Sequence, residues 1–108
     1  MSDQVPPQDL DAEGRVLGAI LCDRAALDAV EGVIAPEDFY RASHGRIYAA
    51  ALALRAEGEQ TDAVSGAARL DRAGALADAG GRARLAELVA LTTSTANAAH
   101  HARLVAAE

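Results

Sequence analysis

Glycine and proline divide this chain into short stretches rich in alanine and leucine, and no stretch shows the apolar–polar alternation of a half-buried strand. Alanine supplies roughly a quarter of the residues and has the highest helix propensity of any residue. Apolar residues within the stretches recur at the spacing of helix turns. The sequence therefore predicts an all-α fold, a small globular bundle of about six helices.

Polar residues stand where helices would begin. The candidate N-caps are Asp9, Asp23, Ser43 and Asp62. Gly58 and Gly74 follow expected helices in the position that favours a left-handed backbone. We expect the longest helix over residues 44–57, with apolar residues on more than one face and therefore neighbours on several sides.

Composition limits what the core can contain. A chain of 108 residues buries about 60 to 70 percent of its extended surface, enough for one core. Trp is absent and Phe39 is the only Phe, so Phe39 is expected to anchor that core. Gly14 falls on the apolar stripe of the first helix, where glycine is costly unless another backbone packs closely. The lone Cys22 is expected to be a small buried thiol.

Charge and residue types exclude several functions. All 10 basic residues are Arg and the net charge is −6. Without Lys there is no P-loop, so we expect no ATP-driven activity and no cofactor in this chain. No convergent set of Ser, His, Lys or Tyr accompanies its acidic residues, so we also expect no catalytic residue. The cations are dispersed, which disfavours direct nucleic-acid binding and favours a protein partner. With no signal segment and no long apolar stretch, the chain is expected to be cytoplasmic.

The histidines and carboxylates offer no clear site for catalysis or for a metal. His100 and His101 are adjacent, and neighbouring side chains on a helix point about 100 degrees apart, so a shared metal ion is disfavoured. His44 is expected to pack and hydrogen-bond locally. Acidic residues near helix starts have an ordinary electrostatic reason to lie there, so no catalytic role or metal site is assigned.

A set of residues spread along the chain occurs in this order and near this spacing in one known family. The set is Pro6-Pro7, Leu10, Glu13, Val16-Leu17-Gly18, Pro36-Glu37-Asp38-Phe39-Tyr40, His44, Ile47-Tyr48, Gly58, Asp62, Gly74, Leu76, Gly80-Gly81, Leu85, Leu88 and Asn97. The most specific segments are PPQDLDAEGRVLGAIL and PEDFYRASHGRIY. Over roughly residues 6 to 106 the chain resembles the N-terminal domain of DnaB-type replicative DNA helicases.

The resemblance implies a protein-interaction role in DNA replication. In that family the domain forms a collar above the motor ring, pairs with neighbouring subunits and docks the C-terminal domain of primase in the primosome. ATP and Mg²⁺ belong to the motor of the parent helicase. The family's primase-facing positions correspond here to Asp11 and Arg84. Arg84 departs from the aromatic residue usual there, and Gly14 and His101 are further departures.

The resemblance also implies a domain division. Residues 1–8 are expected to be an extended lead-in, 9–95 the globular head, and 96–108 the start of a helix that the family continues into a helical hairpin. With little of the hairpin in this sequence, we expect a monomer or weak dimer. Alternative functions are a stand-alone, motor-less head that regulates the helicase or primase, and a simple helical dimerisation module.

Overall fold

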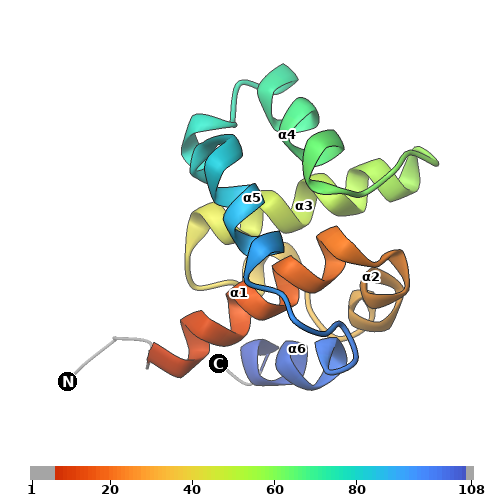
Figure 1. Ribbon diagram of the computed structural model, residues 1–108, viewed down its shortest axis with the longest axis vertical. Coiled ribbons are helices and arrows are strands. Elements are labelled where there is room, and N and C mark those ends of the chain that lie inside the picture. The colour runs from red at the N-terminus through yellow and green to blue at the C-terminus, as the bar shows by residue number, and fades with distance from the viewer. Residues whose placement is uncertain (1–6, 107–108) are drawn as a thin grey trace.

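The computed structural model describes the backbone of residues 7–106 and the side chains of residues 10–106, and every regular element in that span is helical. The elements are α1 (Pro7–Cys22), α2 (Arg24–Glu31), the 3-10 helix η1 (Pro36–Asp38), α3 (Ala42–Ala56), α4 (Ala63–Arg72), the 3-10 helix η2 (Ala77–Ala79), α5 (Gly81–Ala90) and α6 (Ala98–Ala106) (Figure 1). The prediction of an all-α bundle of about six helices is confirmed. Within residues 7–106, no helix is long and apolar enough to cross a membrane.

Helix α1 is the centre of the bundle. It packs against α2, α3, α5 and α6, and Figure 1 shows it crossing the molecule with α6 running alongside it. Val16, Leu17 and Ile20 on α1 are fully buried. Each such side chain contributes about 1.5–3 kcal/mol relative to an exposed position, so α1 holds the other helices together.

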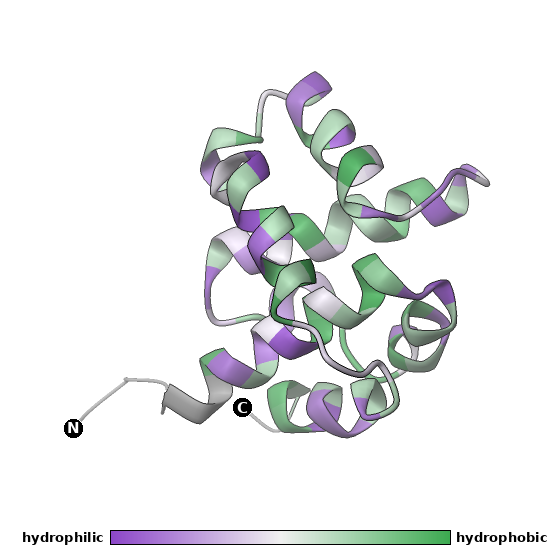
Figure 2. Ribbon diagram, viewed as in Figure 1, coloured by the Kyte–Doolittle hydropathy of each residue, from purple (hydrophilic) through white to green (hydrophobic). Residues whose placement is uncertain are grey.

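Helix α3 is contacted from several sides, as predicted, because it packs against α1, α4, η1 and η2. Figure 2 shows hydrophobic segments, in green, along both α1 and α3. Tyr48 on α3 is fully buried, and its hydroxyl donates to the Ile34 carbonyl at 3.0 Å. Burial raises the pKa of Tyr48 to about 12. Phe39 is also buried, with its ring centroid 5.2 Å from that of Tyr48, which confirms its place in the core.

Local signals set several helix ends as predicted. The carboxylate of Asp23 accepts from the Ala25 N–H at 2.9 Å, and that of Asp62 accepts from the Ser65 N–H at 2.8 Å. Both are N-cap bonds that satisfy a free backbone donor of the first turn. Gly58 and Gly74 have φ of 74° and 72°, the left-handed conformation that glycine adopts after a helix.

Other boundaries were predicted wrongly. Helix α1 begins at Pro7, inside the stretch expected to be an extended lead-in, because proline fits the first turn, where its missing N–H costs nothing. Residues 1–6 and the side chain of Asp9 lie outside the described part. Ser43 is not a cap, since α3 begins at Ala42. Cys22 is exposed rather than buried, because it falls at the last position of α1.

The close helix approach is at Gly18 rather than Gly14. A Cβ at Gly18 would lie 2.5 Å from the Leu88 carbonyl oxygen and 2.0 Å from Thr92 Oγ1, whereas one at Gly14 would meet only the Leu88 side chain at 3.6 Å. Only glycine allows α1 to approach the end of α5 this closely. This contact fixes how α5 and the loop that follows it lie beside α1.

Candidate functional site

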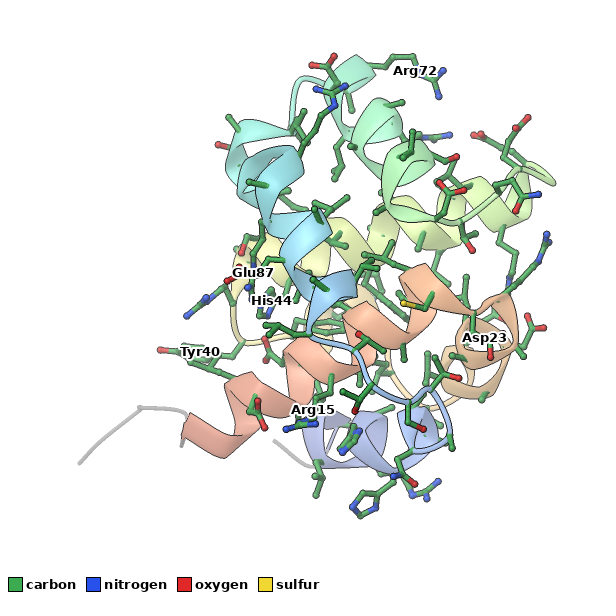
Figure 3. The ribbon with its side chains drawn as sticks, in the orientation of Figure 1. Arg15, Asp23, Tyr40, His44, Arg72 and Glu87 are labelled. Carbon is green, nitrogen blue, oxygen red and sulfur yellow. The ribbon has the colours of Figure 1, made fainter. Side chains whose placement is uncertain are left out.

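A surface hollow of about 400 Å³ lies where α1, the start of α3, α5 and the loop after α5 meet. Its charged or titratable lining residues are Asp11, Arg15, Arg41, His44, Arg84 and His101. Figure 3 labels Arg15 and His44 from this lining, and it places Arg72 far from both, at the end of α4. The hollow is therefore built by residues from distant parts of the chain.

A buried carboxylate lies beneath the hollow. Glu13 on α1 is 2% exposed, and one of its oxygens, Oε2, accepts from the Tyr40 N–H at 2.6 Å. The other, Oε1, lies 2.8 Å from Nδ1 of His44 and 3.4 Å from the Arg41 nitrogen. Glu13 thus receives donors from the segment just before α3, and its negative charge lies near the end of that helix that favours an anion.

His44 connects Glu13 to the hollow. Its ring is 1% exposed, and Nε2 lies 3.0 Å from Nη2 of Arg84. A guanidinium only donates, so Nε2 accepts, and Nδ1 carries the proton that is donated to Glu13. Burial lowers the pKa of His44, with Arg84 and Arg41 acting in the same direction and Glu13 opposing them. The neutral ring is the form that satisfies both partners.

Arg84 on α5 is held on three sides. Its Nη2 binds His44, and its Nη1 donates to Glu87 Oε1 at 2.7 Å. Gly80 leaves room for its stem, because a Cβ on Gly80 would lie 2.8 Å from Arg84 Cβ and 3.0 Å from Arg84 Cγ. The side chain remains 26% exposed. Arg84 is therefore an ordered cation in the wall of the hollow.

The opposite wall carries a second charged pair. Asp11 and Arg15, one turn apart on α1, form an exposed ion pair at 2.9 Å. His101 on α6 lies near this pair; burial lowers its pKa, and the Arg15 charge adds to the effect. Exposed pairs of this kind contribute little to stability, so Asp11 and Arg15 are available for other contacts at small cost.

Apolar and hydroxyl groups complete the hollow. Leu88 and Leu91 from the end of α5 join Thr93 and Ser94 in its lining. Leu91 is 69% exposed, although it is a large hydrophobic residue. An apolar surface beside ordered guanidinium groups is typical of sites that bind proteins.

The structure brings together the two residues that the resemblance pointed to. Asp11 and Arg84 are far apart in the sequence and line the same hollow. Their role in binding a partner stays a prediction. His44 does not bond locally as expected, because its partners are 31 and 40 positions away in the sequence. In the sequence, Glu13 was named only as part of the family pattern and was not assigned to a site. Its position on the apolar stripe of a helix was the available signal, because a buried carboxylate needs hydrogen-bond donors.

The remaining histidines take no part in the network of Glu13, His44 and Arg84. His100 is exposed, while its neighbour His101 faces the hollow. Among the residues described, no group of three or more His, Cys, Asp or Glu is arranged to hold a metal ion. The groups that converge at the hollow are mostly hydrogen-bond donors and cations, which suit an acidic partner group rather than a metal.

The described elements define a small all-helical domain in which a buried hydrogen-bond network ends at a surface hollow. The family described as DnaB-like helicase N terminal domain matches residues 5–107. The replicative DNA helicase DnaB of Geobacillus stearothermophilus is 40% identical over 104 residues, which are 96% of this chain. That of Mycobacterium leprae is 44% identical over 101 residues, or 94% of the chain. The chain belongs to the DnaB-like helicase N-terminal domain family.

A solved structure agrees with this assignment. The crystal structure of the N-terminal domain of DnaB helicase from Mycobacterium tuberculosis matches with a TM-score of 0.90 and 44% identity, covering 95% of this chain and 75% of that one. The chain spans only 23% of the Geobacillus helicase and 17% of the M. leprae helicase. The likeness therefore concerns one domain of these longer proteins.

Proposed function

We propose that this chain is the N-terminal collar domain of a replicative DNA helicase. In the primosome, a cytoplasmic assembly, it docks the C-terminal domain of primase at the hollow. The observation that carries the proposal is the position of Asp11 and Arg84. The family resemblance pointed to each residue separately, and both line one cavity with an exposed leucine beside them. Two such residues on opposite faces of the domain would have argued against a common docking site.

The domain contributes binding rather than chemistry in this proposal. The sequence has no Lys to reach nucleotide phosphates, and the titratable groups at the hollow hold one another in fixed hydrogen bonds. ATP hydrolysis, Mg²⁺ binding and DNA unwinding belong to a motor domain of the parent family. A phosphate-release assay with this chain and ATP should show no turnover above buffer.

The test is a calorimetric titration of this chain with the C-terminal domain of primase from the same cell. Saturable binding is expected. Asp11→Lys should weaken it about 10-fold, because it reverses a charge at the rim of the contact. Glu59→Lys is the matched control, since Glu59 is exposed and does not line the hollow. Absence of binding, or equal loss in both variants, would overturn docking at this site.

Pairing with other helicase subunits is the second part of the proposal, and for this chain alone we expect that pairing to be weak. The covered apolar surfaces of α1 and α3 are used inside the domain, so they are not available for stable assembly. Light scattering of this chain should give a monomer or weak dimer. A stable hexamer would contradict this expectation. A regulatory role for a free-standing head would gain support if this chain bound primase but did not assemble with full-length helicase.

A further inference from the structure

The guanidinium of Arg84 is positioned before any partner arrives. His44 and Glu87 bind its two terminal nitrogens at 3.0 and 2.7 Å, and Gly80 accommodates its stem. His44 is in turn fixed by Glu13, which is buried and also bound to the backbone of Tyr40. An arginine held in this way has already lost the side-chain freedom that a flexible arginine would lose on binding.

Arg84 still has capacity for a ligand. Its bonds to His44 and Glu87 occupy only part of its N–H donors, and about a quarter of the side chain, 26%, is exposed. Arg41 lines the same hollow and, among the described residues, makes no ion pair within 4.0 Å. Arg41 and Arg84 thus place two cations in the lining of one hollow.

The surroundings favour a carboxylate of a protein over a nucleic acid. Asp11 and Glu87 border the hollow or its arginine, and the chain has a net charge of −6. The phosphodiester backbone of a nucleic acid would be repelled by these acidic groups along its length. A single carboxylate would not, and an apolar side chain beside it would cover the exposed Leu91.

We propose that Arg84 and Arg41 form a preset receptor for one acidic side chain of the docked protein, and that an apolar side chain next to it on that protein packs on Leu88 and Leu91. The inference rests on the proposed docking function and adds the chemistry of the occupant. It assigns Glu13 and His44 as positioning residues, which hold Arg84 in place from beneath the hollow. It also gives a reason for an arginine at position 84, where the family usually has an aromatic residue.

Arg84→Gln and Arg84→Lys are the decisive variants, with Arg72→Gln on the far end of α4 as the matched control (Figure 3). The probe is the C-terminal domain of primase from the same cell, titrated at several salt concentrations after circular dichroism has shown that each variant folds. Arg84→Gln should raise Kd at least about 10-fold and flatten its salt dependence. Arg84→Lys should restore only part of the affinity, because lysine lacks the fork that His44 and Glu87 hold.

A spectroscopic measurement tests the positioning. In the free chain, nitrogen-15 spectra should show His44 as the neutral ring protonated at Nδ1, and the Arg84 side-chain signals should be sharp and shift on binding. Primase binding that is equal in wild type and both Arg84 variants would overturn this inference and leave docking intact. No binding in any of them would overturn both. Displacement of primase by a single-stranded DNA oligonucleotide would assign the receptor to phosphate and overturn the carboxylate.

Discussion

Replacement of Glu13 by Gln tests the buried network with a change of a single functional group. Glu13 accepts at both oxygens, from the Tyr40 N–H at 2.6 Å and from Nδ1 of His44 at 2.8 Å. Glutamine has the same shape but offers one acceptor oxygen and one donor amide. Whichever way the amide turns, it presents a donor to a group that is itself a donor.

The only relief is a change of tautomer at His44, which moves the conflict to Arg84. If Nδ1 becomes the acceptor, Nε2 carries the proton and faces the Arg84 guanidinium, now at 3.0 Å. Arg84 must then leave its place. The variant loses charge-assisted hydrogen bonds that contribute about 1.5–3 kcal/mol each, and it leaves a buried donor unsatisfied. We therefore expect Glu13→Gln to lower the free energy of unfolding by about 3 kcal/mol.

Thermal and urea unfolding measure this loss. At about 4–8 °C per kcal/mol for a domain of this size, the melting temperature should fall by roughly 12 °C or more. Glu59→Gln removes an exposed carboxylate and should change stability by no more than about 0.5 kcal/mol. A Glu13→Gln variant within about 1 kcal/mol of wild type would refute the assignment of Glu13 as a required acceptor.

Three further outcomes follow from the packing and the buried histidine. Gly18→Ala should destabilise the chain by about 1–3 kcal/mol, because the new Cβ would meet the Leu88 carbonyl of α5. Gly32→Ala is the control and should leave stability unchanged, since nothing lies within 4 Å of a Cβ there. Equal urea midpoints for the two variants would contradict this. Phe39→Ala should cost about 3–5 kcal/mol, and a thermal melt unchanged within error would refute its role as core anchor. Lowering the pH from about 7.5 to about 5 should reduce stability, because burial holds the pKa of folded His44 below the unfolded value of 6.5, so the unfolded state takes up the proton first; a melting temperature that rises as the pH falls would contradict the sign.

The sequence predicted those parts of the fold that local chemistry decides. Asp23 and Asp62 cap helices whose first donors lie two or three residues away, so a short window contains both partners. Gly58 and Gly74 end helices through their own backbone freedom. For such features the residues that interact are neighbours in the chain.

The start of α3 was predicted wrongly because its partner is distant. The helix begins at Ala42 after Arg41, which makes no side-chain cap. The donors at this end, the N–H groups of Tyr40 and Arg41, are accepted by Glu13 from α1. A window around Ser43 holds no sign of Glu13, which lies 27 positions before Tyr40 and 28 before Arg41, so a serine at the start of the pattern was mistaken for the cap.

The candidate site was predictable only in part for the same reason. Asp11 and Arg84 came from the family resemblance, and nothing in spacing alone joined them in one hollow. Arg15 and Arg41 were missed, because each is an ordinary surface residue until the fold places α1, α3 and α5 beside one another, and His101 was noted as a departure from the family pattern but not assigned to a site. Glu13 carried the stronger signal, since a carboxylate on a buried stripe requires a donor somewhere.

The central place of α1 has a consequence for how the chain is made. Of the described helices, α1 is synthesised first and α6 last, and these two pack against each other. Until residues 98–106 emerge, the side of α1 that meets Ala98, Ala102 and Val105 has no cover. This apolar surface of α1 therefore stays exposed while residues 23–97 are synthesised, and contacts this distant in sequence slow folding. A chaperone that binds exposed apolar surface on nascent chains is expected to bind α1 and to release it once α6 is available to cover it.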